Sequence, residues 1–422
     1  MRQSILLSFV IAGMQFVTQA IAADQTVLGA GNAAADKVAA GSPRVREAPR
    51  FLVAKAATIQ DAALRSATMD LLENRRFCIT SRAGVDDATK NRMIGQLAAA
   101  DLVNLADDAT FPGGIKTGVF PPVLDAETRC PKMPMSFDAA PGSSFTSHHG
   151  YPGGLPIHEA NNLRAAIGLA AGYRASYRAG NPDDGHDDDE APGWLRSPFF
   201  IDQDVIIAAP IWHDWAKTMV FQWTGDGQQF KELNIGGTPA NGSATGGHHI
   251  ISIAESIKRG LPAAFVIAQA LAHSNPTLGN EFKVVNWIRA AAILAQVDPV
   301  SAGYLARDAA GALHLPALRK LADGIDLPGA GQTNLLAEYT LHNLSDGDFT
   351  FSIPAAADAV IVISKLAPFF GFDPADTARF NTAFRNPILA HLSQERLTIV
   401  YANGGLGGVR TELESLRARG VF

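Results

Sequence analysis

The stretch from Ala208 to Thr218, A-A-P-I-W-H-D-W-A-K-T, places three ionisable side chains, His213, Asp214 and Lys217, in an otherwise apolar and helix-compatible run. Burying an imidazole or a carboxylate without a partner is costly, so a fold that buries this run must supply a compensating group. On a helix, adjacent side chains point about 100° apart and can converge on one ion, while Lys217 lies on the same face one turn further on. A metal ion beside a cation suits an anionic ligand such as phosphate. The alternative is a histidine that hydrogen-bonds its neighbour at a helix surface.

The composition is that of a globular protein, because 47% of the 422 residues are hydrophobic and 18% are charged. The formal net charge is −6, and the chain has no block of Lys and Arg. Binding to a phosphate backbone needs clustered cations, so nucleic acid is not expected as the main partner. Helix-like apolar spacing recurs along the chain without βαβ alternation or an internal repeat, which predicts an all-α fold. The oligomeric state stays open.

Residues 1–22 have the features of a secretory signal peptide: the positive Arg2, an apolar centre over residues 5–17, and the small-x-small sequence A-I-A at its end. We predict cleavage after Ala22 and a periplasmic or secreted mature protein without a membrane segment. An uncleaved membrane anchor is the alternative, although polar residues dilute the apolar run.

The mature chain is predicted to have three parts. Residues 23–50 contain Ala, Gly, Ser and scattered charge without periodic apolar spacing, which predicts a flexible leader. Residues 51–146 are predicted to form an N-terminal helical and loop extension, and residues 147–422 a metal-binding helical domain. The two cysteines, Cys78 and Cys130, can form a disulfide in an oxidising compartment, and two buried free thiols are the alternative. Two cysteines cannot build a cysteine-based zinc site, so any metal must be held by histidines and carboxylates.

Several other polar residues stand in helical, largely apolar contexts. His158 follows a Gly/Pro turn near the start of a helix, His248 and His249 begin another helix, and His273 ends a third. Asp358 is the single acidic residue in the apolar sequence A-A-A-D-A-V-I-V-I-S-K-L, where a carboxylate needs a cation or several donors. Two alternatives stay open: His273 could interact with a helix C-terminus through the helix dipole, and Asp358 could pair with Lys or Arg.

The segment H-H-G-Y-P-G-G-L-P-I-H, residues 148–158, is similar to the segment that leads into the first metal-binding histidine in the HD domains of bacterial 3′-5′ exoribonucleases and some conjugative relaxases. The pattern H-D-x-x-K follows at residues 213–217. Over about residues 147–365 the chain therefore resembles the HD-domain superfamily of metal-dependent phosphohydrolases. The resemblance implies an HD-domain-like helical bundle.

The resemblance also implies a set of metal ligands. A first ion would be bound by His158, His213, Asp214 and Asp358, and a second, reached by Asp214, would be bound by His273 with His248 or His249. Lys217 would neutralise charge on phosphoryl oxygens, so Asp214 and Lys217 are the candidate catalytic residues. Binuclear members usually have two adjacent histidines where this chain has His273-Ser274, so one ion is predicted and a second is left open.

The chemistry follows from the ligand types. A metal held by imidazoles and carboxylates supplies hydroxide at neutral pH for attack on phosphorus, and such ligands suit zinc, manganese, iron, nickel or cobalt. We therefore predict an exported metal-dependent phosphohydrolase that acts on a small phosphorylated compound or nucleotide. The alternatives are a di-iron oxygenase on the same scaffold, which needs a complete second site, and a metal-binding protein without turnover.

Overall fold

A computed structural model describes residues 27–176, 201–275, 279–318 and 336–422, and the predicted signal peptide lies outside these ranges. The described chain is mostly helical, which confirms the all-α prediction. Its strands are two short antiparallel hairpins. They pair β1 (Asn234–Ile235) with β2 (Thr245–Gly246), and β3 (Ala306–Arg307) with β4 (Leu313–His314).

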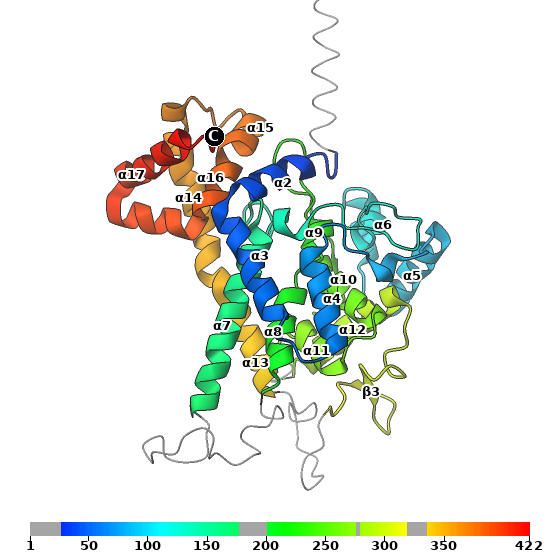
Figure 1. Ribbon diagram of the computed structural model, residues 1–422. Coiled ribbons are helices and arrows are strands. Elements are labelled where there is room, and N and C mark those ends of the chain that lie inside the picture. The colour runs from blue at the N-terminus through cyan, green and yellow to red at the C-terminus, as the bar shows by residue number, and fades with distance from the viewer. Residues whose placement is uncertain (1–26, 177–200, 276–278, 319–335) are drawn as a thin grey trace, which may run out of the picture.

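The helices are distributed along the whole described chain (Figure 1). In the first part they are α2 (Asn32–Gly41), α3 (Pro43–Ala56), α4 (Ala62–Glu73), α5 (Asp87–Ala99) and α6 (Gly114–Val119). The middle part contains α7 (Gly154–Ser176), α8 (Gln203–Trp212), α9 (Lys217–Val220), α10 (Gly247–Lys258), α11 (Ala263–Ala270) and α12 (Glu281–Ala295). The last part contains α13 (Leu336–Ser345), the 3-10 turn η6 (Asp346–Asp348), α14 (Phe349–Leu366), α15 (Thr377–Phe380), α16 (Asn386–Leu392) and α17 (Gln394–Ala418).

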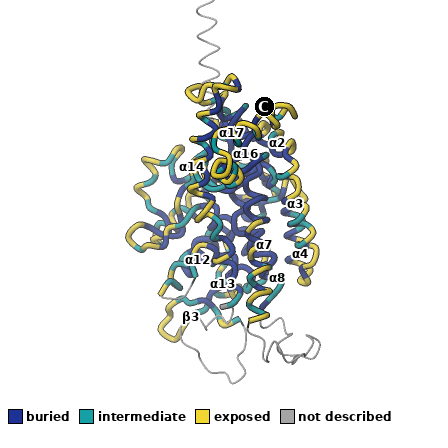
Figure 2. Tube along the Cα trace, turned by 90° about the vertical axis from the view of Figure 1, so that its left-hand side faces the viewer, coloured by how far each residue is buried: buried dark blue, intermediate teal, exposed yellow. Residues whose placement is uncertain are grey.

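The long helix α7 lies along one side of the helical body in Figure 1 and packs against α3, α8 and α13. α8 packs in turn against α11, and α10 packs along α12. Figure 2 shows buried residues along the interior of this body and exposed residues on its outer helices and loops. The N-terminus of α8 is fixed by the Asp202 side chain, which accepts hydrogen bonds from the backbone N–H groups of Asp204 and Val205.

The prediction of a flexible leader over residues 23–50 is wrong for its described part, because residues 32–41 and 43–50 are helical. Ser42 caps α3 by accepting a hydrogen bond from the Val45 N–H, and proline follows the cap at the first helical position. The buried apolar side chains of this segment are mostly alanines, such as Ala35 and Ala39. Alanine favours helix and still packs closely, although it gives little apolar contrast in a sequence.

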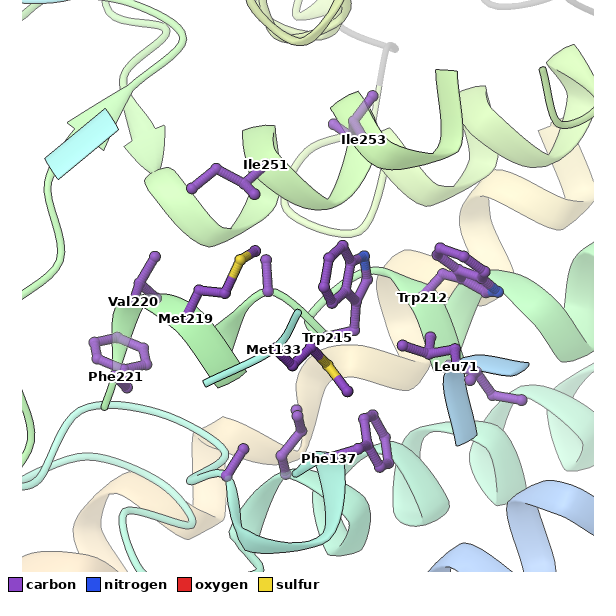
Figure 3. Close-up of a cluster of buried hydrophobic side chains, with 14 of the residues drawn as sticks. Leu71, Met133, Phe137, Trp212, Trp215, Met219, Val220, Phe221, Ile251 and Ile253 are labelled. Atoms are coloured by element: carbon purple, nitrogen blue, oxygen red, sulfur yellow. The ribbon is translucent and has the colours of Figure 1, made fainter. Parts of the chain in front are cut away.

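One hydrophobic core joins both ends of the described chain, from Ala35 in α2 to Leu416 in α17. Residues 51–146 supply Leu71, Met133 and Phe137, which Figure 3 shows in the buried cluster with Trp212 and Trp215. The segment predicted as an extension therefore shares its core with the helix that leads to His213.

The two cysteines form a disulfide in this shared region, with 5.1 Å between the Cα atoms of Cys78 and Cys130. The free-thiol alternative is therefore wrong. A β-bridge between Cys78 and Lys132 runs beside the bond.

The C-terminal helices α14 and α17 pack together at one end of the molecule (Figure 1). α17 changes direction at Gly405, which has a φ of 56° that glycine adopts easily. By length and composition alone, the helical run Ala337–Phe370 could cross a membrane, as core helices of soluble proteins also could, and 44% of its most apolar window is buried. Phe351 and Ile361 of α14 are exposed.

Candidate metal centre

His213 and Asp214 follow directly after α8, between two tryptophans that are fully buried in the core. The indole N–H of Trp212 donates a hydrogen bond to Thr68 Oγ1 at 2.9 Å, and Trp215 packs edge-on against Phe77. These contacts fix the backbone on both sides of His213 and Asp214. The His213 ring is oriented by a hydrogen bond between its Nδ1 and the Pro210 carbonyl oxygen, which are 2.8 Å apart. A proton on Nδ1 makes this hydrogen bond, so Nε2 keeps a free lone pair for a metal.

Four side chains from three separate segments converge at this point, and we call them the four-residue centre. They are His158 in α7, His213 and Asp214 after α8, and Asp346 in η6. His158 Nε2 lies 3.3 Å from Asp214 Oδ2 and 3.1 Å from Asp346 Oδ1. His213 Nε2 lies 3.3 Å from each of the same two oxygen atoms.

These spacings fit ligands of one ion. Metal–ligand distances of about 2.1 Å place neighbouring ligand atoms about 3.0 Å apart at right angles and about 3.4 Å apart at tetrahedral angles. The residues of the centre are buried, and within the described chain neither Nε2 atom makes a hydrogen bond despite these close oxygens. Buried polar atoms that converge without hydrogen bonds require another partner. The four-residue centre could therefore hold a metal ion.

The electrostatics of the centre without an ion show how strongly its groups interact. Burial opposes protonation of His158 and His213, but the surrounding carboxylates outweigh it and raise both pKa values well above the usual range. Burial likewise opposes ionisation of Asp214 and Asp346, but the facing cations hold their pKa values well below the usual range. A bound cation would satisfy the carboxylates and leave the imidazoles neutral.

Lys217 begins α9 and is buried against the centre. Its ammonium group contacts Asp214 Oδ2 and donates to the Gly142 carbonyl. Burial acts to lower the pKa of Lys217, but Asp214 outweighs it and raises this pKa, so the side chain stays cationic. Lys217 thus lies beside Asp214, although the continuous helix expected for His213, Asp214 and Lys217 is interrupted by a turn over residues 213–216.

A second group of ligands faces the other oxygen of Asp214. His248 Nε2 lies 2.9 Å from Asp214 Oδ1, and its Nδ1 contacts the Glu232 carboxylate. Burial acts against protonation of His248, but Glu232 and Asp214 outweigh it and raise its pKa to about 9. The exposed His273 offers a nitrogen close to His213 and Asp214, so this trio could also hold an ion.

The structure distinguishes His248 from His249. The His249 Nε2 atom lies 3.0 Å from the Ala270 carbonyl oxygen, and its ring stacks on His273 with 4.3 Å between the centroids. His248, in contrast, faces Asp214 directly. His248 is therefore the better placed of the two adjacent histidines, and His249 supports the ring of His273.

The prediction that Asp358 completes the ligand set is wrong. Asp358 lies on the exposed face of α14, and Asp346 occupies the expected position. The sequence D-G-D, residues 346–348, forms a single 3-10 turn between α13 and α14, and this turn directs Asp346 toward His158 and His213. An acidic pair at the junction of two apolar helices was the signal that could have found it.

Other groups at the centre also escaped the sequence analysis. Glu159 is buried with its Oε2 atom 3.4 Å from His213 Nδ1, and burial raises its pKa to about 8. The ring of buried His342 lies 5.2 Å from the His213 ring, and its Nδ1 lies 2.7 Å from the Ala268 carbonyl oxygen. Neither has a spacing that distinguishes it from an ordinary helical residue.

The residues of the four-residue centre follow one another along the chain as His, His-Asp and Asp, in three segments that are far apart in sequence. No protein-family model, curated protein or solved structure matches the chain. A cavity of about 600 Å³ between α5 and α12, lined by Arg92, Arg289 and Arg307 among others, contains no residue of the four-residue centre. His273 is exposed, and its ring lies 6.2 Å from the ring of the buried His213.

Proposed function

We propose that this protein is an exported, HD-domain-like metal-dependent phosphohydrolase that acts on a small phosphorylated compound or nucleotide. The observation that carries the proposal is the convergence of His158 Nε2, His213 Nε2, Asp214 Oδ2 and Asp346 Oδ1, with four nitrogen-to-oxygen distances between 3.1 and 3.3 Å. Two imidazoles and two carboxylates suit a divalent transition metal such as zinc, manganese, iron, nickel or cobalt.

A divalent ion at this centre would lower the pKa of a bound water, so that hydroxide is available at neutral pH. The chain itself supplies the surrounding groups. Asp214 spans the two ligand groups, with Oδ2 toward His158 and Oδ1 toward His248. Lys217 is a buried cation that contacts Asp214 and can compensate negative charge on phosphoryl oxygens.

Export is part of the proposal and has separate support. Residues 1–22 have a signal-peptide pattern, and the disulfide between Cys78 and Cys130 suits an oxidising compartment such as the periplasm or the extracellular space.

A second candidate is an HD-fold di-iron oxygenase. It is favoured by the 2.9 Å approach of His248 Nε2 to Asp214 Oδ1 and by the nearby His273, which together offer ligands for a second ion bridged by Asp214. The oxygenase would be favoured if the protein bound two irons, consumed oxygen in the presence of a substrate and hydrolysed no phosphoester.

The test combines elemental analysis of the purified mature chain with a screen of phosphomonoesters and phosphodiesters under manganese, zinc, nickel, cobalt and iron. The variant His213→Ala with Asp214→Ala is expected to lose the ion of the four-residue centre. Activity should fall by at least about 100-fold, because loss of a ligand exceeds the 10–100-fold cost of losing an outer partner of a ligand.

A matched control changes His314→Ala with Asp308→Ala, a surface histidine–carboxylate pair with 3.3 Å between Nε2 and Oδ2. This control should keep both the metal and the activity. Tight metal binding without turnover on any phosphoester would leave a metal-binding protein and reject the hydrolase.

A further inference from the structure

A second polar cluster lies on the opposite side of the His158 ring from Asp214 and Asp346. We call it the outer cluster, and it consists of His148, His149, Asp348 and Glu395. Its residues come from the loop before α7, from η6 and from the first turn of α17. The His158 ring separates the two clusters, because its Nε2 faces Asp346 and its Nδ1 lies 3.3 Å from Asp348 Oδ1.

The distances within the outer cluster suit a common ion. His149 Nε2 lies 3.5 Å from Glu395 Oε1 and 3.9 Å from Asp348 Oδ2. Two ligands about 2.1 Å from one ion are at most about 4.2 Å apart, so both separations can be bridged. His148 offers a further nitrogen at the edge, since ligand atoms of His148, His149, His158 and Asp348 all lie within 4.8 Å of one another.

Five polar atoms of the outer cluster have no hydrogen-bond partner in the part of the chain that the structure describes. They are His149 Nε2, both oxygens of Asp348 and both oxygens of Glu395. His149 is fully buried, so water does not satisfy its ring from the surface. Leaving two carboxylates and an imidazole in this state is costly unless a cation joins them.

Arg44 is the nearby protein cation, and it does not perform this role. Among the described residues, no ion pair joins Arg44 to Asp348 or Glu395, and Arg44 Nη1 is itself buried without a hydrogen bond. Arg44 lies close enough to interact electrostatically with His149 and Tyr151, but it forms no direct contact with the two carboxylates that would pair their charge.

The backbone holds the outer cluster in position. The carbonyl of His149 accepts a hydrogen bond from Gly142 N–H at 2.9 Å, and Arg385 donates to the carbonyls of Phe145 and Gly150 in the same loop. His149 has a φ of 53°, and Ser393, two residues before Glu395, has a φ of 61°. Positive φ is costly for such residues, so the surrounding fold maintains both conformations.

We propose that His149, Asp348 and Glu395, with His148 at the edge, bind a divalent cation distinct from the ion of the four-residue centre. A mixed imidazole and carboxylate set suits zinc, manganese or iron. His158 directs its Nε2 toward the four-residue centre, and its Nδ1 lies 3.3 Å from Asp348 Oδ1, so the His158 ring stands between the two sites. This inference concerns metal binding alone and does not depend on the proposed hydrolase activity.

The experiment is titration of the metal-free mature chain with Zn²⁺ and Mn²⁺, with bound metal counted by elemental analysis after gel filtration. Glu395→Gln removes a ligand charge with little change in size. His149→Asn removes the imidazole and keeps a residue that tolerates positive φ. Each variant is expected to bind one ion fewer per chain than the natural protein, or to bind that ion at least about 100-fold more weakly.

The matched control is Glu412→Gln, an exposed glutamate of the same helix that pairs with Arg396 at 3.1 Å, and it should retain the full metal content. The variant His213→Ala with Asp214→Ala should keep the ion of the outer cluster. Unchanged metal content and affinity in both Glu395→Gln and His149→Asn would overturn the proposal. The proposal would also be overturned if either variant lost every ion while its circular dichroism stayed unchanged. In that case the outer cluster and the four-residue centre would not bind ions separately.

Discussion

Glu255 and Asp346 are both buried carboxylates, but their neighbours are of different kinds. Glu255 in α10 accepts hydrogen bonds from the backbone N–H groups of Thr80 at 2.9 Å and Ser81 at 2.8 Å. It also accepts from the Thr80 hydroxyl and, at 2.7 Å, from Arg259 Nε. Each of its oxygens therefore faces protein donors, and no further ligand is needed.

Asp346 has only one neutral donor among the described residues, the Asn162 amide at 3.3 Å. Its other neighbours are the Nε2 atoms of His158 and His213, which converge on it together with the Asp214 carboxylate. A carboxylate surrounded by donors stabilises a fold, whereas one surrounded by lone pairs and a second carboxylate requires a cation. The two regions thus separate a structural acid from a ligand.

The largest expected effect is on metal binding, from the change Asp346→Asn. The amide keeps the size of the side chain but removes the charge that a cation requires, so affinity for the ion should fall by at least about 100-fold. Elemental analysis and competition with a chelator measure this loss. Asp358→Asn, on the exposed face of α14, is the control and should leave metal binding unchanged. If both variants bound metal like the natural chain, Asp346 would be a structural acid like Glu255.

The opposite pattern is expected for Glu255→Gln. The new amide group would face the N–H groups of Thr80 or Ser81 and Arg259, and leaving these donors without an acceptor should lower the free energy of unfolding by about 1–3 kcal/mol. Metal content should not change. Urea unfolding measures the loss, and Glu412→Gln in an exposed pair is expected to change the free energy by less than about 1 kcal/mol. A folded Glu255→Gln variant that lost metal would remove the distinction between the two regions.

The same distinction explains how much the sequence could predict. The helical class follows from apolar spacing, and His158, His213 and Asp214 stand out because they interrupt apolar helices. The prediction of Asp358 as a ligand follows the same rule and is wrong, because its helix has an exposed apolar face and the carboxylate points to solvent. The packing of helices determines which face is buried, and the local spacing of apolar residues does not predict that packing.

Asp346, which takes the position expected for Asp358, lies in a turn, and only the acidic pair that it forms with Asp348 between two apolar helices marks it in the sequence. Glu395 and Asp348 approach His149 only through the long-range packing of α17 and η6 around the loop before α7. The helical residues 32–41 and 43–50 were missed for a local reason, because alanine gives weak periodicity. The errors at the site concern contacts between segments far apart in the chain, which local spacing does not encode.

The smallest expected effect is on the free energy of unfolding, from a histidine that lies beside two carboxylates at the surface. His314 lies near Glu281 and Asp308, and these groups raise its pKa above the usual value, chiefly through the hydrogen bond from His314 to Glu281. A raised pKa in the folded state stabilises the protein below the unfolded pKa of about 6.5, and this contribution disappears as the pH rises through the folded value. His314→Gln should therefore cost at most about 1 kcal/mol at pH 5.5, because water screens an exposed pair, and still less at pH 8.5. Urea unfolding of both chains at the two pH values measures the difference. If the loss in free energy of unfolding were larger at pH 8.5, the interaction of the protonated ring with the two carboxylates would not be its source. If the loss were as large as that of Glu255→Gln, burial would not determine the strength of these interactions.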